Sequence, residues 1–331
     1  MVSDAPVTQA DTAPTVIDVL NDGSEPAATQ RAAWPTGFDP LDDLLRGGFH
    51  AGELVVVGGR PGVGKTVAAL QWARAAATRG RPVVYVCYEH TPRELVGRLL
   101  CLELGVLARP DELPTLAELR RLAQEFAIGA IPLDALTAHP LGEEACGHVA
   151  RYGASLRLVE ASPSRTGTEE LAALAHGVEP AAVFVDYLQK VALRPAIADE
   201  SERTTRITEA LKEIALRLHV PVVALAAADR EGLTSRRLRL HHLRGSTALA
   251  HEPDVIILLN EKSVAVSKSH LAYDPVRADR YRRQVVFSVE KNRSGPPDLD
   301  LEFSKDFAGF RFDPVGGFLA EKLVDDVLYN E

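Results

Sequence analysis

One stretch of eight residues carries the clearest chemistry in the sequence. Gly59-Arg60-Pro61-Gly62-Val63-Gly64-Lys65-Thr66 matches the phosphate-binding pattern GxxxxGK[ST], with an apolar run at residues 54–57 before it and an alanine-rich stretch after it. Glycines let successive backbone N–H groups surround phosphate oxygens, and the amino end of the following helix adds a favourable dipole. Lys65 is expected to reach the β- and γ-phosphates, and Thr66 to offer its hydroxyl to Mg²⁺. The sequence therefore predicts a nucleoside triphosphate site.

Two carboxylates follow other apolar runs. Asp186 comes directly after residues 182–185, and Glu89 comes after the run 83–88. Ligands of parallel sheets bind at the carboxyl ends of strands, which places Asp186 beside the phosphate loop, where it would order the Mg²⁺ shell. Alone, such an Asp can equally cap a turn. Glu89 could position the attacking water, although its spacing also fits a surface Glu beside a turn.

The order of elements indicates the fold. From Trp34 onward, apolar runs alternate with helix-length amphipathic stretches, the pattern of an α/β domain whose mostly parallel central sheet is flanked by helices. The expected strands are 54–57, 83–87, 156–160, 182–185, 222–226, 255–259 and 285–289, and the expected helices are 66–78, 93–104, 116–126, 168–175 and 204–218. Residues 106–153 are otherwise poorly patterned.

Composition excludes several classes of protein. The chain has 331 residues, of which 46% are hydrophobic, and a net charge of −9. Residues 1–32 are expected to form a disordered acidic tail and residues 33–331 a single nucleotide-binding α/β domain. No run is long enough to span a bilayer, no secretory signal is visible, and three scattered cysteines argue against disulfides. These features predict a cytoplasmic protein with no membrane association.

The segments together resemble the C-terminal motor domain of DnaB-type replicative helicases, a branch of the RecA-like ATPases. The resemblance runs from about residue 33 to 314 and rests on residues 36–42, the phosphate loop, Asp186-Tyr187-Leu188-Gln189, Leu243-Arg244-Gly245-Ser246 and Lys291-Asn292-Arg293-Ser294-Gly295-Pro296. It implies a RecA-like P-loop NTPase with a late β-hairpin and ATP as its nucleotide. It also places Glu89 at the family's catalytic glutamate.

The late basic residues gain a role only through this resemblance. In the family they reach the γ-phosphate held by an adjacent subunit, so Lys291 and Arg293 would stabilise charge in trans. That implies a homo-oligomer, expected to be a hexamer, with nucleotide at the subunit interfaces. From spacing alone, the same residues fit a solvated basic turn.

A basic stretch provides a candidate nucleic-acid contact. Residues 230–244 hold five arginines against the single acid Glu231: Arg230, Arg236, Arg237, Arg239 and Arg244. The resemblance places here the loop that lines the central channel, so these side chains would follow the phosphates of single-stranded DNA. The stretch has no aromatic residues, which favours contact with the backbone over contact with bases. A solvated basic face or a subunit contact is the alternative.

Departures from the family leave more than one function open. The helical N-terminal collar has no recognisable counterpart, and Ala226 and Ala227 stand where the family has Ser-Gln, which senses the γ-phosphate. The expected function is Mg²⁺-dependent ATP hydrolysis by an oligomeric helicase-like or translocase-like ATPase acting on single-stranded DNA in replication or repair. The alternative is a nucleotide-switched assembly or regulatory ATPase without unwinding. A RadA-like recombination ATPase is disfavoured because its zinc module and C-terminal domain are missing. Protein partners are not predicted.

Overall fold

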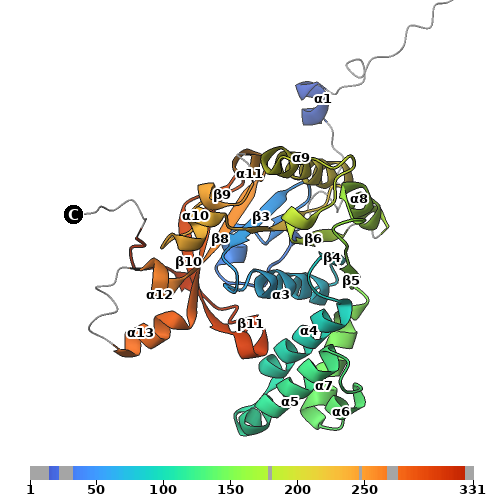
Figure 1. The fold of residues 1–331 in the computed structure, drawn as a ribbon, viewed down its shortest axis with the longest axis vertical. Helices are drawn as coiled ribbons and strands as arrows, with labels where there is room; N and C mark the ends of the chain where they lie inside the picture. Colours follow the sequence, from blue (N-terminus) through green and yellow to red (C-terminus); the bar gives the residue numbers. More distant parts are fainter. Residues whose placement is uncertain (1–14, 22–32, 178–180, 246–247, 267–274, 325–331) are drawn as a thin grey trace, which may run out of the picture.

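The computed structural model describes residues 15–21, 33–177, 181–245, 248–266 and 275–324 (Figure 1). A large sheet has the strand order β11-β10-β9-β8-β3-β7-β6-β4-β5, with β12 paired to β10. Its strands are β3 (Leu54–Gly59), β4 (Val83–Cys87), β5 (Leu156–Glu160), β6 (Ala182–Asp186), β7 (Val222–Ala227), β8 (Val255–Glu261), β9 (Gln284–Asn292), β10 (Leu299–Asp306), β11 (Arg311–Phe312) and β12 (Gly317–Phe318). The pair β1 (Ala33–Trp34) and β2 (Phe49–His50) forms a separate antiparallel ribbon.

The inner parallel strands, β3, β4, β6, β7 and β8, are buried on both faces, which explains their apolar runs, whereas the edge strand β5 is partly exposed. Strand β3 lies between β7 and β8, parallel to both. Its side chains alternate between two cores, with Val55 and Val57 on one face and Leu54 and Val56 on the other. All seven predicted strands are confirmed, with shifts of up to three residues at their ends.

Helices cover the two faces separately (Figure 1). Helix α3, with buried Trp72, packs on the first core, and α8 and α9 pack on the second. The helices are α2 (Leu41–Leu44), α3 (Lys65–Thr78), α4 (Pro92–Leu107), α5 (Leu113–Ala127), α6 (Asp134–Thr137), α7 (Pro140–Gly153), α8 (Thr168–His176), α9 (Glu200–Leu218), α10 (Arg230–Thr234), α11 (Ala248–His251), α12 (Lys262–Ala265) and α13 (Pro275–Arg282), with 3₁₀ turns η2 (Pro110–Glu112), η3 (Leu188–Lys190), η4 (Leu240–His242) and η6 (Phe307–Gly309).

Helices α4 to α7 project from the sheet as a helical extension (Figure 1). They share a core of their own, which includes Leu104, Leu119 and Leu141. The poorly patterned stretch 106–153 is therefore largely helical. Its last helix, α7, buries Leu141, Ala145 and Tyr152, and Val149 packs between them, so the apolar residues of α7 do recur at helical spacing in the sequence.

The expected late hairpin is confirmed, because β9 and β10 pair antiparallel around residues 293–298. In the segment expected to be disordered, the structure describes a short helix, α1 (Val16–Asn21), with Val16 and Ile17 exposed. The rest of that tail lies outside the described residues. Among the helices that the structure describes, none is long and apolar enough to cross a membrane.

Candidate nucleotide site and basic segments

The phosphate loop lies at the carboxyl edge of the parallel strands. It leaves β3 at Gly59 and enters α3 at Lys65, and Gly64 caps the helix with φ 104°. A Cβ on Gly64 would lie 2.7 Å from the Phe312 ring and 2.8 Å from the Phe307 ring, so both the backbone angle and the packing require glycine. The loop therefore presents backbone N–H groups at the amino end of a buried helix.

Lys65 and Asp186 face each other across this edge. The Lys65 ammonium donates to the Gly59 carbonyl at 2.7 Å and the Arg60 carbonyl at 3.1 Å, so the loop itself holds the side chain. Burial lowers the pKa of Lys65, and the charges of Asp186 and Glu89 oppose that shift. Burial raises the pKa of Asp186, which hydrogen bonds from Thr66 and Tyr85 counteract. The Tyr85 hydroxyl donates to Asp186 Oδ2 at 3.0 Å.

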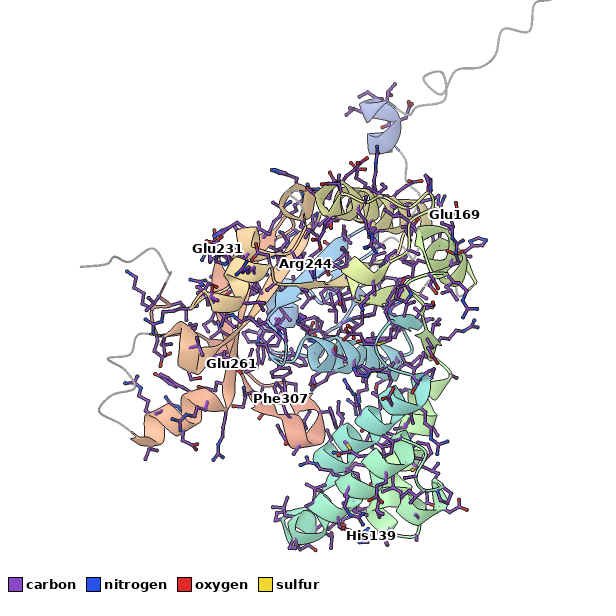
Figure 2. The ribbon with its side chains drawn as sticks, in the orientation of Figure 1. His139, Glu169, Glu231, Arg244, Glu261 and Phe307 are labelled. Carbon is purple, nitrogen blue, oxygen red and sulfur yellow. The ribbon has the colours of Figure 1, made fainter. Side chains whose placement is uncertain are left out.

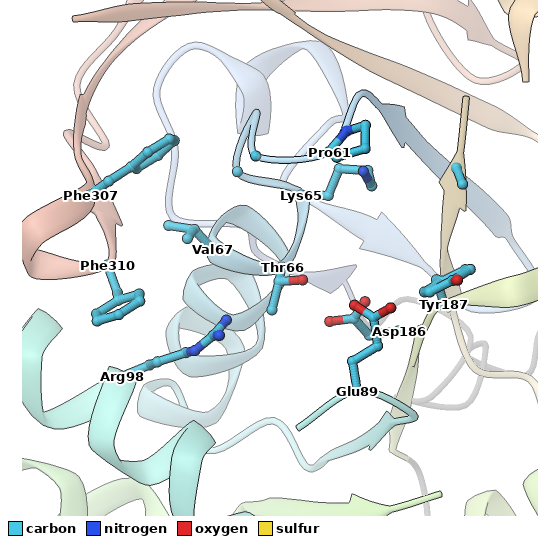
Figure 3. A pocket seen from close by; sticks show the side chains of 13 residues that line it. Pro61, Lys65, Thr66, Val67, Glu89, Arg98, Asp186, Tyr187, Phe307 and Phe310 are labelled. Carbon is cyan, nitrogen blue, oxygen red and sulfur yellow. The ribbon is translucent and has the colours of Figure 1, made fainter. Parts of the chain in front are cut away.

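A pocket of about 440 Å³ brings most of the predicted residues together (Figure 3). The predicted residues that line it are Pro61, Gly62, Gly64, Lys65, Thr66, Glu89 and Asp186. Val63 is instead buried beneath the loop, and Gly59 is the buried end of β3. Six lining residues were not predicted as site residues: Val67, Arg98, Tyr187, Ala227, Phe307 and Phe310.

Arg98 is the most polar of these additional residues. It projects from α4 into the pocket toward Thr66 (Figure 3). Its guanidinium donates to His90 Nε2 at 2.8 Å and lies 5.1 Å from the centre of the Phe310 ring. Burial, and next the charge of Arg98, lower the pKa of His90, which favours the neutral imidazole that accepts this bond. The sequence signal was present, since Arg98 lies on the predicted helix that follows Glu89.

Phe307 and Phe310 give the pocket an aromatic side. Both belong to the turn around η6 that follows β10, more than 200 residues after the phosphate loop. Figure 3 shows the two rings on the opposite side of the pocket from Glu89 and Asp186. No local pattern could have found them, because only the return of β10 and β11 to the phosphate loop places them there.

The donor set fits a Mg²⁺ ion bound together with a nucleotide. Thr66 offers a hydroxyl and Asp186 a carboxylate, the hard oxygen ligands that Mg²⁺ prefers, and Mg²⁺ takes further oxygens from phosphates and water. Across the described part of the chain, no group of three or more His, Cys, Asp or Glu is placed to hold a metal alone. A metal at this edge would therefore depend on the nucleotide.

Lys291 and Arg293 lie at the opposite edge of the sheet. Lys291 pairs with Ile256, and Arg293 donates its backbone N–H to the carbonyl of Asp254, just before β8 begins. The register places them roughly 15 Å along the strands from the phosphate loop. Arg293 also contacts the Asp254 carboxylate at 3.1 Å, yet half of its side chain is exposed. The structure therefore does not bring these two residues to their own chain's pocket.

The five arginines of the basic stretch divide into two groups. Arg237 and Arg239 pair with Asp300 at 2.9 Å and Glu290 at 3.0 Å, on β10 and β9. Arg236 donates to the carbonyl of Val266 at 3.1 Å. Arg230, at the start of α10, and Arg244, which pairs with Glu200, are exposed. The basic character of the stretch is thus partly neutralised within the chain.

Arg60 also departs from its expected place at the phosphates. Its guanidinium turns away from the pocket and donates to the Gly232 carbonyl at 2.8 Å and to Ser235 Oγ at 3.2 Å. The phosphate loop is therefore joined to α10 and to the residue that follows it.

The fold and the site together define a RecA-like P-loop ATPase domain. The sequence profile of the DnaB-like helicase C terminal domain matches residues 33–135 and 162–312, and the chain belongs to that family. The unmatched interval, 136–161, contains α7 and β5, as well as the second half of α6.

Individual relatives agree with this assignment. The chain is 29% identical over 282 residues to the replicative DNA helicase DnaB of Treponema pallidum, covering 83% of this chain and 55% of that protein. It is 28% identical to that of Leifsonia xyli, covering 79% and 52%. It thus spans about half the length of these curated relatives. The solved ATPase domain of G40P has the same fold, with a TM-score of 0.66 at 20% identity, covering 86% of this chain and 92% of that one.

Proposed function

We propose that this chain hydrolyses ATP with Mg²⁺ in the pocket at the carboxyl edge of the sheet. The observation that carries the proposal is the convergence of the phosphate loop, Asp186 and Glu89 on one cavity. Lys65 and the loop amides would bind the β- and γ-phosphates, and Glu89 would orient the attacking water. Mg²⁺, held by Thr66 and Asp186, would neutralise developing charge on the phosphates. The rings of Phe307 and Phe310 would provide an apolar aromatic surface against which the adenine base of ATP could stack.

We infer further that the chain works as a ring-forming oligomer, a hexamer by family analogy, on single-stranded DNA. Lys291 and Arg293 are displaced from their own pocket, which supports their use at a neighbouring subunit's nucleotide. Exposed Arg230 and Arg244 supply the DNA contact. Replicative DNA helicases are the named relatives, and helicase activity in replication is the corresponding proposal for this chain.

A second function, a nucleotide-switched assembly ATPase without unwinding, has its own support. Arg237 and Arg239 are already paired with carboxylates of the same chain, which reduces the charge available to DNA. Ala226 and Ala227 leave the end of β7 with no side-chain hydrogen-bonding group.

The deciding experiment is the steady-state ATPase rate with and without single-stranded DNA, at low and at physiological salt. Stimulation that fades with salt supports the DNA motor, whereas a rate indifferent to DNA supports the assembly ATPase. Glu89→Gln should retain nucleotide binding and lose about 100-fold or more in turnover in either case. Nucleotide binding without hydrolysis in the wild type, under conditions where it oligomerises, would overturn the assignment of Glu89.

A further inference from the structure

The segment between β7 and Arg244 is joined to the nucleotide site by two side chains. Near its start, the Arg60 guanidinium from the phosphate loop bonds to Gly232 and Ser235. At its end, the amide of Gln189 bonds to Arg244. Gln189 lies in η3, three residues after Asp186, so each link comes from one side of the pocket.

Gln189 makes two bonds that point in different directions. Its Oε1 accepts the backbone N–H of Ala227 at 3.2 Å, and its Nε2 donates to the backbone carbonyl of Arg244 at 2.9 Å. Arg203 of α9 donates to the carbonyls of Gln189 at 3.0 Å and Val191 at 2.9 Å, which fixes the backbone from which the amide extends. The amide is therefore held at both of its polar atoms and at its base.

The residues at the two ends of this amide belong to different functional parts. Ala227 lines the nucleotide pocket, whereas Arg244 is exposed (labelled in Figure 2). The two residues are themselves joined, since the Arg244 N–H donates to the Ala227 carbonyl at 2.9 Å. A shift of η3 or of Ala227 toward bound phosphate would thus change the position of the Arg244 backbone directly.

Strand β7 has no polar side chain of its own that could respond to a nucleotide in the pocket. Ala226 is fully buried and Ala227 has only a methyl group, so β7 can communicate with the pocket only through its backbone and the groups bonded to it. Among the residues that the structure describes, Gln189 provides a side-chain hydrogen bond to that backbone, at Ala227.

We propose that Gln189 is a positioning residue that couples nucleotide occupancy to the Arg244 segment, in place of a side chain on β7. The proposal deepens, and for its DNA consequence rests on, the function proposed above. Gln189 touches neither nucleotide nor DNA in this assignment; it sets where the Arg244 backbone lies when the pocket is filled.

Hydrogen exchange on the full chain tests the coupling without DNA. Amide exchange at residues 227 and 242–244 would be measured in two states, without nucleotide and with Mg²⁺ plus the non-hydrolysable analogue AMP-PNP. The two states would be compared in the wild type and in Gln189→Met. In the wild type, amide exchange at these residues should slow about tenfold when AMP-PNP binds. In Gln189→Met, the exchange rates with and without AMP-PNP should be equal. A merely structural role would speed exchange in both states and leave the ratio between them intact. That result, or no nucleotide effect in the wild type, would overturn the coupling.

Two further variants sharpen the test. Gln189→Glu keeps an acceptor for the Ala227 N–H but places a carboxylate oxygen against the Arg244 carbonyl, so the nucleotide effect should persist at residue 227 and disappear at 242–244. Gln124→Met, at an exposed position of α5, is the matched control and should behave as wild type. Equal responses at both places in Gln189→Glu would contradict the two-bond mechanism.

A DNA arm separates this inference from the proposed function. Wild type should bind labelled single-stranded oligothymidine about tenfold more tightly with AMP-PNP than with ADP, and Gln189→Met should bind equally with both while basal ATPase stays unchanged. If AMP-PNP slows exchange in the wild type but not in Gln189→Met, and neither protein binds DNA, the DNA function fails and the coupling stands. If DNA binds with unchanged nucleotide dependence in Gln189→Met, the coupling fails and the function stands.

Discussion

Lys65 is held by the phosphate loop before any nucleotide arrives. Its ammonium donates to the carbonyls of Gly59 and Arg60, and the nearby Asp186 and Glu89 stabilise its positive charge against the effect of burial. Lys65→Ala should therefore lower ATP turnover by about 100-fold or more, because a preorganised donor to the phosphates is lost. The measurement is ATPase rate alongside thermal unfolding. Lys322→Ala, at an exposed position remote from the pocket, is the control and should leave the rate unchanged.

His90 introduces a pH dependence beside the pocket. Its imidazole accepts from Arg98, and Glu89, Glu94 and Asp186 are the carboxylates whose charges act on it. Its pKa lies below the ordinary 6.5, so between these two values the unfolded chain binds a proton that the folded chain does not. Stability should therefore fall as pH drops below 6.5, by at most about 1.4 kcal/mol per pH unit from this group.

The check is urea unfolding of wild type and His90→Gln between pH 7.5 and 5.5. The Gln variant keeps an acceptor for Arg98 and has no titrating ring, so its stability should depend less steeply on pH. Parallel curves for the two proteins would show that His90 does not contribute to the acid sensitivity.

At the scale of elements, helix α7 provides a test of how the helical extension packs. A Cβ on Gly142 would lie 2.1 Å from the carbonyl oxygen of Leu136, whereas one on Gly147 would meet nothing within 4 Å. Gly142→Ala should destabilise the protein by about 2 kcal/mol through forced backbone movement. Gly147→Ala, in the same helix, should stabilise it by about 0.5–1 kcal/mol. Denaturant unfolding of the pair measures both, and equal effects would contradict the α6–α7 packing.

The segment after β7 contains arginines of two kinds, and their substitutions should differ. One guanidinium nitrogen of Arg237, Nη2, donates to both carboxylate oxygens of Asp300, at 2.9 and 3.1 Å, and only 11% of the Arg237 side chain is exposed. Arg237→Ala should destabilise the fold by about 2 kcal/mol, because Asp300 loses its charged partner. Arg230→Ala should keep the free energy of unfolding within about 0.5 kcal/mol of the wild type but weaken binding to single-stranded DNA. The slope of the logarithm of the DNA-binding constant against the logarithm of salt concentration should become shallower by about 1. Salt titrations of DNA binding and unfolding curves separate the two. Unchanged DNA binding in Arg230→Ala would remove that residue from the interface.

Most of the sheet could be predicted from the sequence, because strands buried on both faces must be apolar throughout. The phosphate loop was equally predictable, since Gly64 and Lys65 meet a local chemical requirement. The aromatic side of the pocket was not, because Phe307 owes its position to the pairing of β10 and β11. Nor could the sequence show that Arg60 turns toward α10, or that Arg237 is neutralised by Asp300, since both contacts join segments far apart in the chain.

At the scale of the whole molecule, the proposed function assigns different parts of one reaction to the two edges of the sheet. The carboxyl edge presents the phosphate loop, Asp186 and Glu89, and the amino edge presents Lys291 and Arg293. The two edges lie at opposite ends of the parallel strands within one copy, whereas the proposed head-to-tail interface between copies would place one edge against the other. Arg293 is suited to this use because its guanidinium is half exposed and held in place by Asp254 and the His251 carbonyl.

Mixing two inactive variants tests that arrangement. Arg293→Ala subunits retain Glu89, and Glu89→Gln subunits retain Arg293, so a mixed assembly contains some interfaces with both groups intact. Each variant alone should be nearly inactive, and an equal mixture should recover up to about a quarter of wild-type ATPase if interfaces act independently. Subunit exchange is verified by native mass spectrometry, and a mixture of Arg293→Ala with Lys65→Ala,Arg293→Ala is the control that should not recover. Exchange without recovery would show that Arg293 does not act on its neighbour's nucleotide.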